Sequence, residues 1–238
     1  MCRAILCLTA TRNEILTSTQ EMPVPTASGG GPSSYRELLF IKLMNGMRRV
    51  FGLYVCAVQT GSSDSAGEMP QLPLEVEIRL LGAPEIRRYV DGAGLDLRGD
   101  SVDAALARGD VCAGAFVARQ LVSYTWRALR GPVPHNADWE VVWNPGLVYR
   151  YKALTLPEYR GFRINEAVAK TVDRHLAKEG HDVGLSFVEM TNVSSMRTLT
   201  RKGRRRIGYA GYLQRFGLYI PFRTAGCRRY GFRFNHRK

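Results

Sequence analysis

The chain has 238 residues, of which 45% are hydrophobic and 23% charged, a balance typical of a globular protein with a substantial core. No run approaches the roughly 18 to 20 apolar residues that a membrane-spanning helix needs, so any membrane contact is expected to be peripheral. The five cysteines are scattered, without a CxxC pair or a histidine at zinc-ligand spacing. We therefore expect no metal site and a reduced, cytoplasmic setting.

The charge is uneven along the chain. Thirteen of the 34 Lys and Arg residues lie in the last 42 residues, from Arg197 onward, where no Asp or Glu occurs. The preceding 196 residues hold 21 basic and 21 acidic side chains, so the whole net charge of +13 belongs to this C-terminal part. Such asymmetry predicts an anionic partner, which could be a nucleotide-like cofactor, a nucleic acid or an acidic membrane surface. A solvated basic face is the alternative.

The N-terminal part has two loop-like stretches. Residues 1–34 end in "PVPTASGGGPSS", whose Pro, Gly and Ser content predicts a flexible leader. A helical pattern, "YRELLFIKLMNGMRRV", and a strand-like "FGLYVCAV" follow before the second loop. We expect an N-terminal extension over 35–70, a main domain over 71–222 and a basic C-terminal segment over 223–238.

The first half of the main domain alternates between strands and helices. "LEVEIRLL" predicts a strand, "APEIRRYV" and "SVDAALARG" predict short helices, and "VCAGAFVARQLVSYTWRAL" predicts a hairpin that turns at "ARQ". "WEVVW" and "LVYRYKALTL" are expected to pair with each other across the turn "NPG".

The second half contains the clearest helical pattern. Ile164, Val168, Val172 and Leu176 recur at steps of four, and Gly180 is placed to end the helix. Because this helix joins "LVYRYKALTL" to "VGLSFVEM", those two strands should be parallel. A short basic helix and two more strands follow. The order predicts an α/β or α+β fold: a mixed, largely antiparallel twisted sheet with helices on both faces.

The segment "TLPEYRGFRI", residues 155–164, joins a predicted strand to that helix. It resembles the pyrophosphate loop of the GNAT superfamily, the acyl-CoA-dependent N-acyltransferases, in which an Arg precedes two spaced small residues. Arg160 matches the first position of the family motif, whereas Arg163 and Asn165 stand where the small residues would be. Unpaired N–H groups at a helix start carry the positive end of the helix dipole and can bind a pyrophosphate.

A second stretch, "TNVSSMRTLTRKG", also resembles the family. Asn192, Ser195 and Gly203 reproduce its spacing of an Asn after a strand, a small residue three positions later and a Gly after a short helix. The resemblance implies that Asn192 contacts the pantetheine arm, but capping of the helix is an equal explanation, and one residue can do both. Leu199 stands where the family often has the Tyr that protonates the departing thiolate.

The resemblance implies direct transfer of an acyl group from acetyl-CoA, or another acyl-CoA, to a primary amine, most simply that of a small molecule. It implies an oxyanion-binding backbone N–H near Thr155. The cofactor-binding residues that it implies are Thr155, Arg160, Gly161, Phe162, Arg163, Ile164, Asn192 and Ser195.

The attacking amine must lose a proton, because an alkylamine has a pKa near 10. Glu140, in a strand expected at the centre of the sheet, is the first candidate for the proton acceptor. Glu189, at the end of "VGLSFVEM", is the second.

Two other functions stay open. "RRYGFRF", residues 228–234, interleaves Arg with aromatic residues, a composition that stacks bases and binds phosphates, so a nucleic-acid partner of the basic C-terminal region is one alternative. An edge strand with outward arginines is another explanation of this segment. The departures at Arg163, Asn165 and Leu199 also allow a GNAT-like fold that binds CoA without catalysis.

Overall fold

The computed structural model describes residues 34–62, 68–72, 75–201 and 204–237. Apart from Ser34, the expected leader over residues 1–34 lies outside the described residues. The helices are α1 (Tyr35–Phe51), α2 (Ala83–Arg87), α3 (Gly99–Arg108), α4 (Ile164–Lys178), α5 (Val193–Arg201) and α6 (Ala225–Arg229), with a 3-10 turn at Pro157–Tyr159.

Most of the strands belong to one large sheet with the order β10-β9-β1-β8-β7-β4-β3-β2, and three short ones form a second sheet, β11-β6-β5. The strands are β1 (Leu53–Ser62), β2 (Glu77–Leu81), β3 (Val111–Val117), β4 (Gln120–Ala128), β5 (Val133–Pro134), β6 (Trp139–Val142), β7 (Val148–Thr155), β8 (Val183–Glu189), β9 (Arg205–Arg215), β10 (Leu218–Arg223) and β11 (Arg233–His236).

The large sheet is antiparallel except where β7 meets β8. The expected parallel pair on either side of the long helix is therefore confirmed, as is the mixed, largely antiparallel sheet with helices on both faces. In α4 the predicted apolar stripe is confirmed too: Ile164, Val168, Val172 and Leu176 are each at most 1% exposed. Gly180 follows the helix with φ +85°, a left-handed conformation that glycine adopts without cost.

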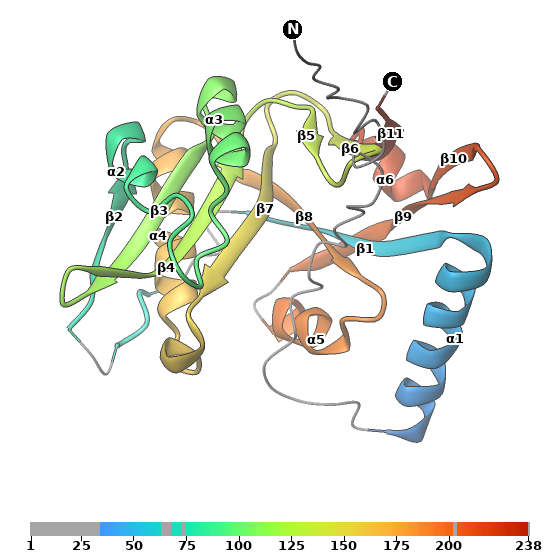
Figure 1. Cartoon of the computed structure of the whole chain (residues 1–238), viewed down its shortest axis with the longest axis horizontal. Helices are drawn as coiled ribbons and strands as arrows, with labels where there is room; N and C mark the ends of the chain where they lie inside the picture. The colour runs from blue at the N-terminus through green and yellow to red at the C-terminus, as the bar shows by residue number, and fades with distance from the viewer. Residues whose placement is uncertain (1–33, 63–67, 73–74, 202–203, 238) are drawn as a thin grey trace, which may run out of the picture.

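Strand β1 comes from the segment 35–70, yet it lies inside the sheet. It pairs with β8 from Cys56–Glu189 to Ser62–Val183, and with β9 from Leu53–Leu213 to Thr60–Arg205. Figure 1 shows β1 running through the sheet from the end of α1, between β8 and β9. The N-terminal part of the chain thus joins the two strands that follow α4 in the sequence.

The three-stranded sheet corrects one expected pairing. Strand β6 pairs with β5 and with β11, at positions such as Val141–Val133 and Glu140–Asn235, and not with β7. The pairing across "NPG" was wrong because C-terminal residues, far away in the sequence, supply the partner strand. No local turn pattern reveals such a long-range pair.

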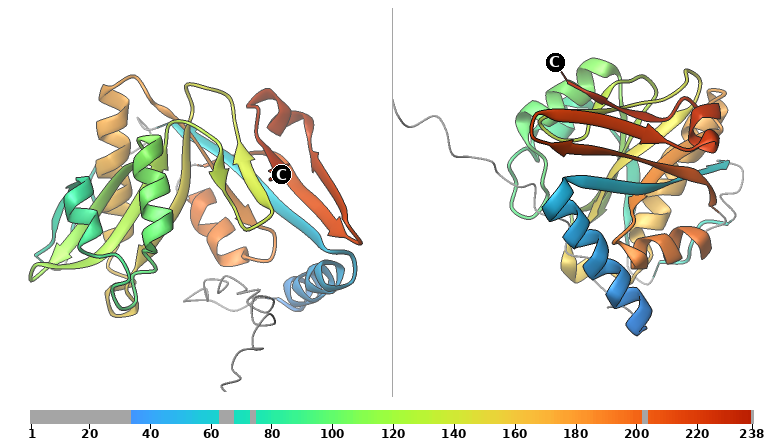
Figure 2. Two further views of the ribbon diagram at one scale, coloured as in Figure 1. Left: turned by 45° about the horizontal axis from the view of Figure 1, so that its top comes forward. Right: turned by 90° about the vertical axis from the view of Figure 1, so that its right-hand side faces the viewer.

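The two faces of the large sheet are covered by different elements (Figures 1 and 2). Tyr124 of β4 donates a hydrogen bond to the Leu95 carbonyl, between α2 and α3, whereas Arg127 of the same strand reaches Asp173 of α4. The three-stranded sheet packs on the same face as α2 and α3, at the β1 and β9 end, where Trp139 stacks on Tyr212 with ring centroids 4.2 Å apart. The buried apolar residues form two clusters: one lies around β2, β3 and β4, and the other lies around β1, β9 and the three-stranded sheet.

The contact between β1 and β9 can be tested with a glycine. A Cβ added at Gly211 would overlap the carbonyl oxygen of Tyr54 and lie 2.6 Å from Phe222. We expect Gly211→Ala to lower the free energy of unfolding by about 2 kcal/mol or more, because backbone atoms cannot move away cheaply. Denaturant unfolding measures it. Gly46→Ala in α1, with nothing within 4 Å, is the control and should be neutral or stabilising by up to about 1 kcal/mol. Equal effects of the two substitutions would contradict this placement of β1.

Candidate active site

The centre of the large sheet opens between β7 and β8. Among the described residues, these two parallel strands pair only at Val148–Gly184 and Tyr149–Leu185. Beyond that point β7 continues beside β4 to Thr155, and β8 continues beside β1 to Glu189. The C-terminal ends of the two strands therefore separate, and we call the space between them the β7–β8 gap. In open α/β sheets, ligands bind at such a position outside the C-terminal ends of strands.

The edge of β7 that faces the gap carries backbone polar groups. The N–H of Leu156 donates to the Val122 carbonyl of β4 at 2.9 Å. Because successive N–H groups in an extended strand point in opposite directions, the N–H of Thr155 points away from β4, toward the gap. The Thr155 side chain instead contacts Ser123, with 2.8 Å between the two hydroxyl oxygens. The backbone N–H of Thr155, predicted from the sequence as a candidate oxyanion donor, therefore faces the gap.

The loop after β7 lies at the open end of the gap. Arg160 is exposed, and its Nε donates to the Thr155 carbonyl at 3.1 Å. Gly161 and Arg163 both have left-handed backbone conformations, with φ +88° and +60°. For a residue with a Cβ this conformation costs of the order of 1 kcal/mol, so a glycine would fit the position of Arg163 at lower cost. Phe162, between them, is 38% exposed.

The first turn of α4 presents unpaired N–H groups to this loop. The N–H groups of Glu166 and Ala167 donate to the Arg163 carbonyl, and no side chain caps the helix start. Those of Ile164 and Asn165 precede the first intrahelical bond, as at any helix start. The guanidinium of Arg163 folds back onto Glu166 at 2.9 Å. The site therefore has the dipole and the donors for an anion, together with one carboxylate nearby.

The start of α5 lies beyond the C-terminal end of β8. The Asn192 side chain accepts a hydrogen bond from the N–H of Ser195 at 3.0 Å, which confirms the capping role. The Asn192 N–H donates to the Glu189 carbonyl at 2.9 Å. This tight turn brings the start of α5 close to the open end of the gap.

Glu189 lies on the face of β8 that is opposite to α4. Its strand neighbour Phe187 packs against Phe234 of the three-stranded sheet, and residues two apart in a strand share a face. The carboxylate of Glu189 pairs with Arg48 of α1 at 2.9 Å, and about a quarter of its side chain is exposed. Its side chain thus lies at the end of the strand that borders the gap, in an ion pair with Arg48.

Glu140 does not lie in the large sheet. It belongs to β6, where it pairs with Asn235 and Pro134, so the expected position on a central strand was wrong. The alternation in "WEVVW" indicated a strand correctly. Its partner strands could not be predicted, because one of them, β11, lies about 90 residues later in the sequence.

His135 lies in an aromatic cluster on the same face as Glu189. Its ring centroid is 5.0 Å from that of Tyr54 and 5.2 Å from that of Phe234. Burial lowers the pKa of His135 to about 4, and the nearby positive charge of Arg48 adds to this effect. The imidazole is therefore neutral at physiological pH.

Tyr151 of β7 forms a contact that the sequence analysis missed. Its hydroxyl donates to Asp110 at 2.8 Å, and Arg108 pairs with the same carboxylate at 2.6 Å. Burial raises the pKa of Asp110, although Arg108 and Tyr151 oppose this, and burial also raises the pKa of Tyr151. The hydroxyl therefore stays protonated in its contact with Asp110. In the sequence, the local indication of this contact is a pair of charged residues, Arg108 and Asp110, directly before an apolar strand.

The segment 228–234 runs from the end of α6 into β11. Phe232 and Phe234 are fully buried in the aromatic cluster, so these two rings are not available to stack on bases. Within the described residues, no helix could cross a membrane, and no group of three or more His, Cys, Asp or Glu side chains could hold a metal ion.

No known protein family and no curated protein matches the chain. Several solved structures do. A Drosophila protein is 18% identical, covering 79% of this chain and 58% of its own, with a TM-score of 0.48. A tandem GNAT protein from the clavulanic acid biosynthesis pathway is 13% identical, covering 90% of this chain and 61% of its own, also with a TM-score of 0.48.

A third solved structure, an aminoglycoside N-acetyltransferase in complex with CoA, is 16% identical. It covers 63% of this chain and 97% of its own, with a TM-score of 0.43. This chain spans less than two thirds of the length of the first two proteins. At such low identities and TM-scores, the activities of these proteins do not transfer to this chain, so its function rests on its own residues.

The neutral His135 predicts a specific dependence of stability on pH. Its pKa is about 4 in the folded protein and near 6.5 in the unfolded chain, so the unfolded state binds more protons between these values. Stability from this group is complete above pH 6.5 and is lost as the pH falls toward 4, by at most about 3 kcal/mol. Urea unfolding across this range should show a shallower loss for His135→Phe than for the wild type.

Phe187→Leu is the control for that measurement, because it alters the same aromatic cluster without removing a titrating group. It should lower stability by a similar amount at every pH. Parallel curves for His135→Phe and the wild type would show that His135 is not held neutral.

Proposed function

We propose that the protein is a GNAT-type N-acyltransferase that transfers an acyl group, most simply acetyl, from acyl-CoA to a primary amine in a ternary complex. The observation that carries the proposal is the β7–β8 gap, with an outward N–H at Thr155 and the uncapped start of α4 at its open end. A strand edge suits the amide groups of a pantetheine arm, and a helix start suits a pyrophosphate. The two features adjoin, as one CoA molecule requires.

The proposed contacts to CoA come mostly from the backbone. The N–H groups over 161–165 would meet the pyrophosphate, with the exposed guanidinium of Arg160 beside them. The start of α5, at Asn192 and Ser195, would border the pantetheine arm from the side of β8. The N–H of Thr155 would stabilise the negative charge that develops on the thioester oxygen.

Glu189 is the proposed proton acceptor, and Glu140 is kept as the comparison. In the transfer, the amine nitrogen attacks the thioester carbon, the C–S bond breaks, and one amine proton passes to the carboxylate. Glu189 ends the strand that borders the gap, and Arg48 holds its carboxylate in place. A thiolate whose conjugate thiol has a pKa near 8.5 can leave without a dedicated acid, so Leu199 in place of Tyr does not prevent the reaction.

A GNAT-like fold that binds CoA without turnover is the second candidate. Arg163 in a left-handed conformation and Glu166 beside the helix start favour it, because both hinder the approach of a phosphate. A small-molecule amine acceptor and a cytoplasmic location complete the proposal. Cys56, Cys112 and Cys227 are buried free thiols, as a reduced compartment allows.

Arg163→Gly tests the proposed phosphate site. We expect it to tighten acetyl-CoA binding several-fold by calorimetry, because glycine adopts the left-handed conformation freely and lets a phosphate approach the backbone. Arg163→Ala, which keeps a Cβ and also loses the charge, should not tighten it. Equal weakening by both substitutions would mean that the Arg163 side chain itself holds the phosphate. No binding by the wild type at millimolar acetyl-CoA would refute the proposed function.

Glu189→Gln tests the proton acceptor. We expect it to lower kcat by about 10²–10⁴ near neutral pH with little effect on acetyl-CoA affinity. The deficit should shrink at alkaline pH, where the amine loses its proton to water. Glu140→Gln is the matched control and should retain kcat. If only Glu140→Gln loses activity, the roles of the two carboxylates are reversed.

A further inference from the structure

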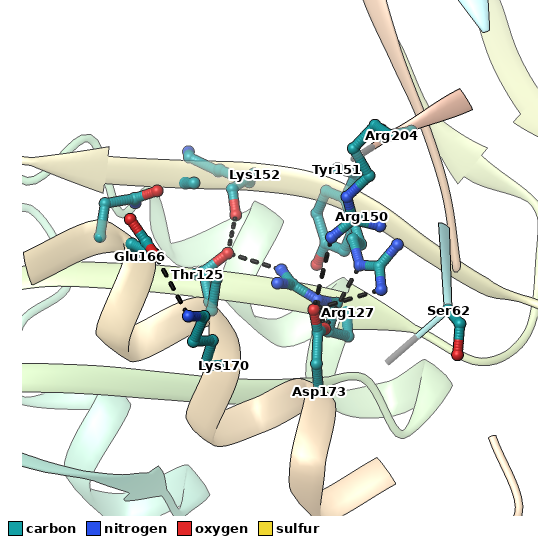
Figure 3. Close-up of a pocket in the computed structure, with 14 residues that line it drawn as sticks. Ser62, Thr125, Arg127, Arg150, Tyr151, Lys152, Glu166, Lys170, Asp173 and Arg204 are labelled. Carbon is teal, nitrogen blue, oxygen red and sulfur yellow. Dashed lines mark hydrogen bonds and ion pairs between the residues drawn. The ribbon is translucent and has the colours of Figure 1, made fainter. Parts of the chain in front are cut away.

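A cavity of about 280 Å³ lies between α4 and the strands β4 and β7. Its inner end is lined by Arg127, Arg150, Asp173, Ser186 and Arg204. Figure 3 shows Arg127 and Arg150 from the strands, and Arg204 from the residue directly before β9, gathering around Asp173. This cluster was not predicted from the sequence. The signal was a charged residue within an apolar strand, as in "SYTWRAL" and "LVYRYKAL".

Three arginines share one carboxylate in this cavity. Asp173 lies 2.8 Å from Nε of Arg127, 3.2 Å from Nη2 of Arg150 and 3.6 Å from Nη2 of Arg204. The side chains of Arg127, Arg150 and Asp173 are each less than 10% exposed. The Arg204 side chain is 15% exposed, so the three arginines and Asp173 together carry an excess of two positive charges in a largely buried cluster. Charges buried without partners are costly.

The electrostatics of Asp173 and Arg150 reflect this excess. Burial alone would raise the pKa of Asp173, but Arg127 and Arg150 outweigh it and lower that pKa below its usual value. Burial lowers the pKa of Arg150; Asp173 opposes this effect, whereas Arg127 adds to it. Glu166, the other acidic residue of the cavity, pairs instead with Arg163 and Lys170 near its outer end.

Polar atoms around the inner end lack hydrogen-bond partners. Among the described residues, Nη1 of Arg204 and Oγ of Ser186 are buried and make no hydrogen bond, and neither does the buried Oε1 of Gln59, the residue that pairs with Ser186 across the strands. Nη2 of Arg150 is also buried and forms the ion pair with Asp173 at 3.2 Å, but no hydrogen bond within the described part of the chain. Buried polar groups are nearly always satisfied, so several around one cavity indicate a missing ligand. Two guanidinium groups and a hydroxyl are donors, which selects an acceptor with negative charge.

We propose that this cavity binds one oxyanion group of a small molecule, a carboxylate or a phosphate, held by Arg150, Arg204 and Ser186. The site differs from the proposed pyrophosphate site, because Arg150 and Ser186 directly follow the paired residues Tyr149 and Leu185, at the closed end of the gap. The group has two possible sources. It belongs either to a free anion or to the far end of an acyl chain, as in a dicarboxylic acyl-CoA. Binding of a free anion does not depend on the proposed function.

The first test measures thermal unfolding of the whole chain in sodium phosphate, sodium succinate and sodium chloride at equal ionic strength. We expect millimolar phosphate or succinate to raise Tm by about 4 °C or more over chloride. The second arm compares succinyl-CoA with acetyl-CoA by calorimetry. Tighter binding of succinyl-CoA, without an effect of the free anions, would assign the group to an acyl chain. If neither arm shows a difference, the cavity holds only water and the proposal is wrong.

Arg204→Gln is the test variant in both arms. It removes one excess charge, so we expect it to keep the Tm in chloride but to lose most of the shift caused by the anion. Ser186→Ala leaves the charges intact and should reduce the shift, which gives a second variant if the first folds poorly. Arg88→Gln, at an exposed arginine directly after α2, is the matched control and should keep the full shift. An equal loss of the shift in the control would indicate general charge screening and overturn the proposal.

Discussion

The incomplete pairing of β7 with β8 is the constraint on which the proposed site depends. Each strand finds a different antiparallel neighbour, β4 for β7 and β1 for β8, and the two strands separate after Tyr149 and Leu185. Separation leaves strand edges whose N–H and C=O groups still need partners. The loop to α4, the start of α5 and the arginine cavity all border on this opening, so each proposed role refers to one structural feature.

At the closed end of the opening, where β7 and β8 are still paired, the Arg150 side chain lies against Gly184. The Arg150 guanidinium occupies the space beside Gly184 where a Cβ would lie, so a side chain at residue 184 would displace this guanidinium from its present position. The same guanidinium belongs to the cluster around Asp173. Arg150 therefore both packs against Gly184 and pairs with Asp173. A ligand at the open end and an anion at the closed end would stabilise the same separation of the strands.

Local patterns predicted much of the fold, whereas long-range pairing could not be predicted. The four-residue steps of α4, Gly180 after its end and the parallel strands around it follow from periodicity and chain connectivity. The insertion of β1 between β8 and β9, and the pairing of β6 with β11, depend on residues far apart in the sequence. The site follows the same division: Thr155, Arg160 and Asn192 lie in recognisable local motifs, but the partners of Arg150 and Glu189 come from distant elements.

Amide hydrogen exchange with and without acetyl-CoA tests the central claim, that the opening between β7 and β8 binds acyl-CoA. The account predicts that saturating acetyl-CoA slows exchange in peptides over 150–156 and 160–167, whose N–H groups border the opening and its loop. Peptides over 205–223, in β9 and β10, should exchange at the same rate with and without the ligand. Slower exchange confined to the basic C-terminal strands, or no change anywhere, would contradict the account.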